Sequence, residues 1–392
     1  MSQRVIEQSM AQRIAGLELN ALLYAGVLPS DVFQKARIHS IVTPIYDING
    51  EILFYRVPVI KNRLGIGYAD IAANTAFTQP LLGVSYGKAW NEKAILEEAV
   101  SAAKKKQKKL KYDQVRFVAY SYPKLAIQFL LNEKEIVMLE WATWELVPRE
   151  QKREYDVPPS NFERWSLIEE TPNEKHQKNL RKFKKHISNW DDIYPPKSKK
   201  FPPEILDIAN FEKVVKIFPV VRSRELHYSH NNADHTPCYE LRGQLTNVWC
   251  VAASVQMILD FYRYNYQQTR IASDLGLGTL SSPNGLPYSR DNDVVTVLEN
   301  LTSNALDASM NTTPNWNEFV NEINENRPLI SFIPGHSRTV AGYTSVRLFN
   351  WYFFRGLLVY DPWPPTTGVI TRWENFDNQT YRRTFTAHLT LV

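Results

Sequence analysis

The cysteine at position 250 has the surroundings of a reactive thiol. Cys250 lies in the stretch GQLTNVWCVAASVQMIL, residues 243–259, between a tryptophan and a run of small residues. A cysteine in a peptide has a pKa near about 8.5, and its thiolate form is the nucleophile. The apolar spacing after Cys250 predicts a helix, and the dipole at a helix N-terminus lowers the pKa of a thiol placed there. The pattern therefore indicates a nucleophilic cysteine.

Two residues further along the chain have the types that such a nucleophile needs as partners. His336 follows a glycine and begins a β-rich run, and Asp361 ends the next long apolar run. A histidine takes up the thiol proton and later returns it to a leaving group, while a carboxylate orients the imidazole. If the two runs are neighbouring antiparallel strands, we expect both side chains at one end of the sheet.

Acyl transfer also produces an oxyanion, which needs hydrogen-bond donors. Gln244, six positions before Cys250, has a side-chain amide that can donate. The backbone N–H of Cys250 is a second donor, because the first N–H groups of a helix have no partner within it. We therefore expect a catalytic site made of Cys250, His336, Asp361 and Gln244, with no metal and no cofactor.

These residues resemble the motif of the papain-like cysteine peptidases. The likeness rests on the order Gln244, Trp249-Cys250, His336 and Asp361-Pro362-Trp363. Within that group it looks most like the branch of the bacteriocin-processing, staphopain and streptopain peptidases. The resemblance implies a cysteine endopeptidase that acts on proteins or peptides. It implies Cys250 as the nucleophile, His336 as the general base and acid, and Asp361 as the orienting group. It also implies Gln244 in the oxyanion hole and Trp363 as a shield for the His336–Asp361 hydrogen bond.

The sequence departs from that family at two places. Ser337 and Arg338 follow the histidine, where small or aliphatic residues are common, and the orienting group is Asp361, where papain itself has asparagine. Neither change removes a catalytic group. Both therefore bear on specificity rather than on the chemistry.

Residues 204–392 predict an α+β domain with helices first and an antiparallel sheet second. Helical spacing occurs in residues 247–264, 289–302 and 315–326, and strand composition in residues 328–333, 337–346, 351–362, 367–373 and 383–392. Helices followed by strands form a segregated α+β fold. This order agrees with the papain-like fold that the resemblance implies.

Residues 1–148 predict a separate α+β unit with an antiparallel sheet. A helix is expected over residues 4–26, a hairpin around Asn49-Gly50, strands over residues 67–73, 80–90, 115–131 and 134–148, and a helix over residues 91–112. The pattern is similar to the propeptides of streptopain-like zymogens. That resemblance implies an inhibitory prodomain that folds against the peptidase and blocks it.

Residues 149–203 are charged and contain several prolines, with little apolar periodicity. This composition favours a linker with processing sites, whose cleavage would activate the zymogen, including by its own activity. The basic run Arg181–Lys185 is typical of a solvated surface, with a processing or anion-binding site as the alternative.

Length and composition agree with two folded domains. The chain has 392 residues, 44% hydrophobic and 22% charged, and a net charge of +5. It has no apolar run of the about 18 residues that a membrane span needs, and its N-terminus lacks the apolar core of a signal peptide. By resemblance we expect an extracytoplasmic or secreted protein whose signal is missing from this sequence, with a cytoplasmic location as the alternative.

Other interpretations of the same residues remain open at this point. Cys250 could be a buried structural thiol, could pair with Cys238, or could join His235 and Cys238 around zinc. The acidic run at residues 291–293 fits a helix cap better than a calcium site. An acyl transferase or amidase could use the same triad. A binding protein could instead use the basic runs 104–109 and 181–185 to hold nucleic acid or acidic surfaces, although we expect no nucleic-acid partner.

Overall fold

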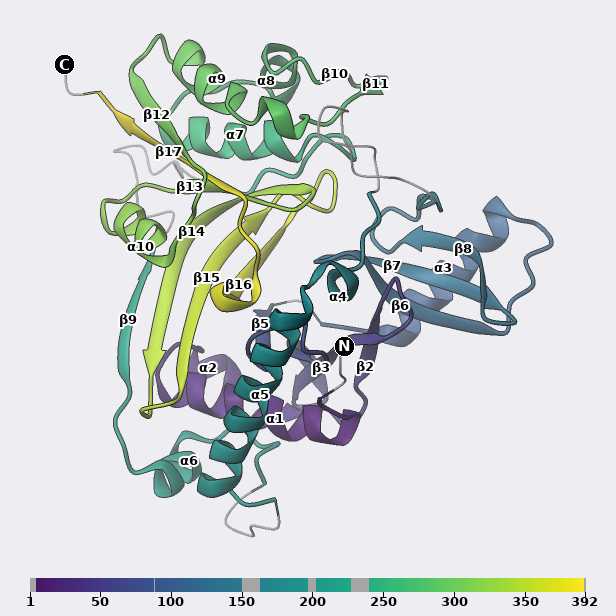
Figure 1. Cartoon of the computed structure of the whole chain (residues 1–392), viewed down its shortest axis with the longest axis vertical. Helices are drawn as coiled ribbons and strands as arrows, with labels where there is room; N and C mark the ends of the chain where they lie inside the picture. Colours follow the sequence, from purple (N-terminus) through teal and green to yellow (C-terminus); the bar gives the residue numbers. More distant parts are fainter. Residues whose placement is uncertain (1–4, 88, 150–162, 197–201, 227–239, 391–392) are drawn as a thin grey trace. The chain divides into compact units, whose positions relative to one another are not determined.

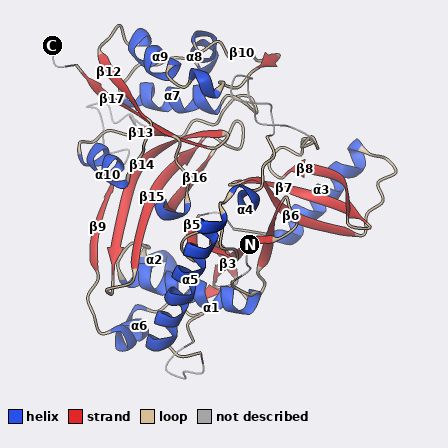
Figure 2. Ribbon diagram, in the orientation of Figure 1, coloured by secondary structure: helices blue, strands red, loops and turns tan. Residues whose placement is uncertain are grey.

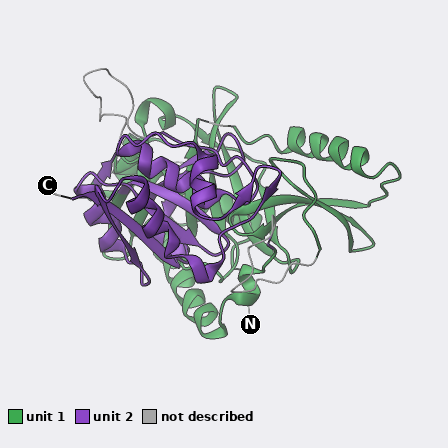
Figure 3. Ribbon diagram, turned by 90° about the horizontal axis from the view of Figure 1, so that it is seen from above, with its two compact units in different colours: residues 1–149, 164–222, 344–356 green, residues 150–163, 223–343, 357–392 purple. Residues whose placement is uncertain are grey.

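The computed structural model describes residues 5–87, 89–149, 163–196, 202–226 and 240–390 (Figure 1). The chain forms two compact units that alternate along the sequence. Unit 1 contains residues 1–149, 164–222 and 344–356, and unit 2 contains residues 150–163, 223–343 and 357–392 (Figure 3). Each unit combines helices with a mainly antiparallel sheet (Figure 2), which confirms the α+β class.

Unit 1 contains the two helices and the Asn49-Gly50 hairpin expected of residues 1–148, together with further elements that the sequence did not predict. Its helices are α1 (Gln8–Tyr24), α2 (Ser30–Phe33), α3 (Glu92–Lys106), α4 (Leu167–Glu170), α5 (Asn173–Ile193) and α6 (Ile208–Val215). Its strands are β1 (Arg37–Ile38), β2 (Thr43–Asp47), β3 (Ile52–Lys61), β4 (Leu64–Ala72), β5 (Leu81–Tyr86), β6 (Gln114–Ser121), β7 (Lys124–Leu131) and β8 (Lys134–Glu140). At the predicted turn, Gly50 has φ +94° and its N–H donates to the Asp47 carbonyl at 3.0 Å. A positive φ of this size favours glycine.

The sheet of unit 1 has the order β5-β4-β3-β2-β6-β7-β8, with β1 beside β3. All of these pairs are antiparallel except β2 and β6, which are parallel. The antiparallel sheet predicted for residues 1–148 is therefore present with one parallel exception.

Residues 149–203 contain more regular structure than their composition predicted. They include α4 and the 21-residue helix α5. The buried face of α5 includes His176, Asn179, Phe183 and Trp190, so half of it is polar and the apolar period is hard to recognise. Hydrogen bonds compensate for this burial: His176 Nδ1 lies 2.7 Å from the Thr75 hydroxyl, and the Asn179 amide donates to the Thr75 carbonyl at 2.9 Å. Residues 150–162 and 197–201 lie outside the described residues.

Unit 2 follows the predicted order of helices before sheet only in part, because one strand precedes its first helix and another, not predicted from the sequence, precedes its last helix. Its helices are α7 (Cys250–Phe261), α8 (Gln268–Asp274), α9 (Asp293–Leu301) and α10 (Trp316–Asn324), with short 3-10 turns at Tyr288–Arg290 and Phe376–Asn378. Its main strands are β12 (Leu306–Asn311), β13 (Leu329–Ile333), β14 (His336–Arg347), β15 (Phe353–Asp361), β16 (Val369–Asn375) and β17 (Arg383–Leu389). Two shorter strands, β10 (Gly278–Thr279) and β11 (Ser282–Pro283), form a separate ribbon.

The main sheet of unit 2 has the order β12-β17-β13-β14-β15-β16, and β9 (Val220–Glu225) lies beside β14. β14 and β15 are therefore neighbours (Figure 1), and the turn that joins them, within residues 344–356, belongs to unit 1. This order places the start of β14 next to the end of β15, as the sequence predicted for His336 and Asp361.

A hydrophobic core holds the start of α7 in place. The core contains residues of α7, α8 and α9 together with strand residues such as Ile330, Phe332 and Phe385. Trp249, the residue before the helix, is 1% exposed, and its indole N–H donates to the Leu277 carbonyl at 3.0 Å. This packing fixes the position of Cys250, the first residue of α7.

Candidate active site

Cys250 is a half-buried thiol at the N-terminus of α7. The small residues Ala252 and Ala253 after it are fully buried and let α7 pack closely, while the thiol keeps partial exposure. A helix N-terminus carries a partial positive charge, which stabilises a thiolate. The local structure therefore meets the first requirement for a nucleophile.

His336 lies between the thiol and a carboxylate. Its Nε2 is 2.6 Å from Oδ1 of Asp361, and the same oxygen accepts the backbone N–H of Trp363 at 2.8 Å. The ring also interacts with the Cys250 thiol. Because Asp361 occupies Nε2, the buried Nδ1 is the nitrogen left for the sulfur. Trp363 is itself 5% exposed, and so it adds to the burial of this region.

The charges around His336 favour its protonated form. Burial alone lowers the pKa of His336, but the Asp361 carboxylate and the Cys250 thiol outweigh this and raise the pKa above its ordinary value. Burial likewise raises the pKa of Asp361, but His336 and Arg338 outweigh it and leave the pKa below its ordinary value. The arrangement therefore favours an imidazolium held against an ionised carboxylate.

Gln244 is fixed to the loop that follows Asp361. Its backbone N–H donates to the Pro362 carbonyl at 3.0 Å, and its own carbonyl accepts the Thr366 N–H at 2.8 Å. Gly243 permits this close approach, since a Cβ there would lie 2.3 Å from the Thr366 backbone. The Gln244 amide donates to the Thr246 carbonyl at 2.6 Å, and an amide has a second hydrogen to donate.

The described residues give little support to the zinc and calcium sites considered as alternatives. His235 and Cys238 lie outside those residues, and within them no group of three or more His, Cys, Asp or Glu side chains could hold a metal. Asp291 pairs with Arg382 at 3.1 Å and with Arg383 at 3.5 Å. Its carboxylate is therefore neutralised by guanidinium groups. The predicted helix cap is wrong in detail, because Asn292 at the N-cap makes no side-chain capping bond.

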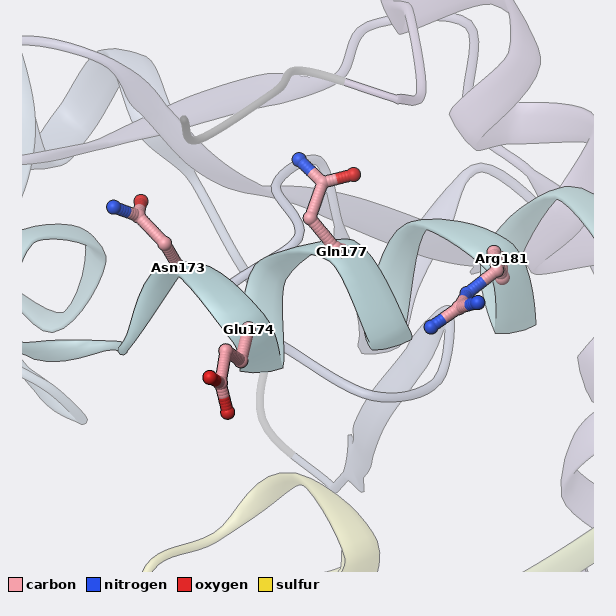
Figure 4. A pocket seen from close by; sticks show the side chains of 4 residues that line it. All are labelled: Asn173, Glu174, Gln177 and Arg181. Atoms are coloured by element: carbon pink, nitrogen blue, oxygen red, sulfur yellow. The ribbon is translucent and has the colours of Figure 1, made fainter.

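The basic run of α5 is solvent-exposed. Arg181, Lys182, Lys184 and Lys185 are exposed, whereas Phe183 between them is fully buried. The same helix lines a hollow of about 560 Å³ through Asn173, Glu174, Gln177 and Arg181 (Figure 4). These four side chains include no nucleophile, so they cannot themselves perform acyl-transfer chemistry.

Sequence reasoning missed the groups that support His336. Ser337 and Arg338 were expected to bear on specificity, yet each is 1% exposed. Side chains this deeply buried are poorly placed to contact a substrate. Ser337 bonds to Ser254 on α7, and Arg338 pairs with Glu374 on β16. The sequence signal was the presence of polar residues inside an otherwise apolar strand.

This arrangement can perform nucleophilic acyl transfer, because it combines a thiol at a helix N-terminus with an imidazole in contact with it and a carboxylate behind the imidazole.

Residues 237–387 match the model of the Peptidase_C39 like family. The match covers less than half of the chain. It supports a cysteine-peptidase fold for this C-terminal segment.

Two solved structures show weaker likeness. One is a double-glycine-motif protease from an AMS/PCAT transporter in complex with the leader peptide, with 18% identity over 38% of this chain and 91% of that chain, and a TM-score of 0.26. The other is UfSP from C. elegans, with 15% identity over 39% of this chain and 33% of that chain, and a TM-score of 0.25. Scores this low do not define a common fold. No curated protein sequence matches the chain significantly.

No helix in the described part of the chain is both long and apolar enough to cross a bilayer.

The charge of Asp361 should set the upper pH limit of activity. In Asp361→Asn the side-chain oxygen still accepts from His336 Nε2, so the tautomer is kept and the loss of rate should be well below the about 10⁴-fold cost of a wrong tautomer. Removing the carboxylate removes the strongest influence that raises the pKa of His336. The imidazolium then deprotonates at lower pH, and the alkaline limb of kcat/KM moves to lower pH.

The pH profile of kcat/KM on a peptide substrate measures this shift. Asp307→Asn is the matched control, because Asp307 forms an exposed pair with His388 at 3.3 Å in the same unit. An unchanged alkaline limb in Asp361→Asn would contradict the assignment of Asp361.

Proposed function

We propose that the protein is a cysteine endopeptidase of the papain-like group, in the bacteriocin-processing and staphopain-streptopain branch. The observation that carries this proposal is His336, hydrogen-bonded to Asp361 and in contact with the Cys250 thiol at the start of α7. The match of residues 237–387 to the Peptidase_C39 like model supports the same conclusion.

In the first half-reaction, the thiolate of Cys250 attacks the carbonyl carbon of a peptide bond. The oxyanion that forms accepts hydrogen bonds from the Gln244 amide and the backbone N–H of Cys250. His336 then donates its proton to the amide nitrogen, the C–N bond breaks and the amine leaves. A thioester to Cys250 remains.

In the second half-reaction, water attacks the thioester. His336, now neutral, accepts a proton from the water, and the C–S bond breaks to return the thiolate. The second product leaves as a carboxylic acid. Asp361 holds the imidazole in one orientation through both halves and stabilises its charged form.

We further propose that residues 1–148 act as an inhibitory prodomain and that the protein is a zymogen. Unit 1 includes the turn between β14 and β15, so this region shares a compact unit with part of the peptidase segment. Within that unit, the Trp190 ring lies 5.1 Å from the Trp351 ring, and the Trp190 indole donates to Glu18 at 2.9 Å. These contacts join α1, α5 and the turn.

The helical structure of α5 and the division into units both limit where an activating cut could occur. A backbone inside a hydrogen-bonded helix is a poor protease substrate, so α5 is an unfavourable place for the cut. We therefore place the cut in the remainder of residues 149–203. Because α5 and residues 344–356 belong to unit 1, a single cut would not by itself separate the N-terminal region. An extracytoplasmic location agrees with this scheme.

Autoprocessing tests the proposal. On incubation of the wild-type chain in reducing buffer, we expect intact mass spectrometry to show fragments ending within residues 149–203, while Cys250→Ala stays whole. Wild-type enzyme added to Cys250→Ala distinguishes cutting between molecules from cutting within one. Identical fragmentation of the wild type and Cys250→Ala would contradict self-cleavage, since a contaminating protease would then be responsible.

A further inference from the structure

Two buried polar residues follow His336 on β14. Ser337 and Arg338 are each 1% exposed. Adjacent side chains on a strand point to opposite faces of the sheet. Ser337 accordingly reaches α7, and Arg338 reaches β16. Burying such groups is costly unless they are paired, so each needs a structural or functional reason to be present.

Ser337 joins the histidine strand to the cysteine helix. Its hydroxyl donates to the Ser254 hydroxyl at 2.8 Å, and both serines are buried. Ser254 is four residues after Cys250 on α7, so it lies one helical turn behind the nucleophile. Met257 lies about one turn further along α7, and its sulfur is 3.6 Å from the hydroxyl of Thr339 on β14. The Ser254–Ser337 bond therefore fixes the helix against the strand close to the thiol and the imidazole.

Arg338 spans the strand that carries Asp361. The guanidinium of Arg338 pairs with both carboxylate oxygens of Glu374 on β16, one of them at 2.9 Å. The order of the strands is β14-β15-β16, so this ion pair bridges over β15. Neighbouring strands are about 4.8 Å apart, and the two long side chains together cover twice that distance. Asp361 is the last residue of β15.

The guanidinium also acts on Asp361 through its charge. After His336, Arg338 is the next charged group that lowers the pKa of Asp361. The Nε of Arg338 is buried and makes no hydrogen bond within the described residues. Glu374 therefore satisfies the ends of the guanidinium, while its positive charge remains near the Asp361 carboxylate.

We propose that Arg338 with Glu374, and Ser337 with Ser254, are positioning residues that hold Asp361 and His336 in place beside Cys250. This inference rests on the proposed peptidase function. The two pairs act on different parts of the site: the ion pair holds the carboxylate, and the hydroxyl pair holds the distance between imidazole and thiol.

A double substitution separates this role from a purely structural one. Arg338→Met alone would leave the Glu374 carboxylate buried without its partner, which is strongly destabilising and could prevent folding. Replacing a whole buried ion pair with apolar residues is often neutral for stability. We therefore choose Arg338→Met/Glu374→Met, made in the full chain, and the thermal unfolding midpoint to show that the variant folds.

The readouts are kcat and KM on a peptide substrate, and the rate of Cys250 alkylation by iodoacetamide from acid to neutral pH. For Arg338→Met/Glu374→Met we expect KM to be nearly unchanged and kcat to fall by about 10- to 100-fold, as a small misplacement of catalytic groups would cause. The acid limbs of two pH profiles, that of kcat and that of the Cys250 alkylation rate, should move to higher pH. Without the guanidinium, Asp361 becomes protonated at higher pH.

Ser254→Ala/Ser337→Ala removes a hydrogen bond and no charge. We expect this variant to lower kcat without moving the acid limb. Arg327→Met/Glu322→Met is the matched control, since Arg327 and Glu322 form another two-bonded ion pair in unit 2, at 2.7 and 3.1 Å. It should leave kcat and both pH profiles unchanged.

The inference is overturned if the folded Arg338→Met/Glu374→Met variant keeps the kcat and acid limb of the wild type. Its failure is distinct from that of the peptidase proposal, because alkylation needs no substrate. If the wild type cleaved no peptide, but the pH dependence of Cys250 alkylation still differed between the wild type and the double variant, the result would contradict the proposed function and support the positioning role.

Discussion

Cys250→Ala should abolish peptide hydrolysis while leaving the fold intact. Removing the nucleophile of a catalytic triad lowers kcat by on the order of 10⁶-fold, because the oxyanion donors and substrate binding provide what little catalysis remains. Alanine removes only the sulfur of a half-buried side chain at the start of α7. We therefore expect thermal unfolding close to that of the wild type, and kcat/KM on a peptide substrate to fall by a similar factor.

Cys238→Ala is the matched control for this loss, since the chain has two cysteines. It should retain wild-type kcat/KM. Loss of activity in both variants would indicate a disulfide bond or a shared metal rather than a single nucleophile. Retained activity in Cys250→Ala would contradict the account of the site.

His336→Gln should lower kcat about as much as loss of the nucleophile, on the order of 10⁶-fold, because triad members act as one unit. Glutamine fills much of the imidazole volume but neither accepts the thiol proton nor returns it to the amine. The neighbouring positive charge is also lost, so the Cys250 thiolate is less stabilised and should be alkylated more slowly at mildly acidic pH. The alkylation rate of Cys250 as a function of pH measures this change.

His388→Gln provides the comparison for His336→Gln. His388 pairs with Asp307 in the same unit and is 51% exposed at its side chain, so its loss should leave kcat and the alkylation profile unchanged. The variant that combines Cys250→Ala with His336→Gln should lose no more of its kcat than either single variant. An additive loss would mean that the two residues act independently.

The candidate site could be predicted from the sequence because its signals are local. A cysteine at the start of a helical period, a histidine that begins a β-run and an aspartate that ends one can each be recognised from a few neighbours. The structure places the latter two on adjacent strands, with Nε2 of His336 2.6 Å from the Asp361 carboxylate. Gln244 lies beside the loop after Asp361, and its role as an oxyanion donor stays a prediction.

The supporting residues could not be predicted because their partners are distant in sequence. Arg338 and Glu374 are 36 positions apart, and they meet only because β16 lies one strand beyond β15. That order requires the complete sheet topology. The same limit explains why residues 344–356 joined unit 1, whereas the sequence had assigned them to the C-terminal domain. In α5, buried polar residues concealed the helical period.

Selective alkylation of Cys250 tests the central claim most directly. The wild-type chain, in reducing buffer at mildly acidic pH, would be treated with a thiol-alkylating epoxide, and the adduct would be located by peptide mass spectrometry. The account predicts one adduct, at Cys250, with Cys238 unmodified and with no adduct at Cys250 in His336→Gln. Equal modification of the two cysteines, or no modification of Cys250 after another protease has cut the chain within residues 149–203, would contradict it.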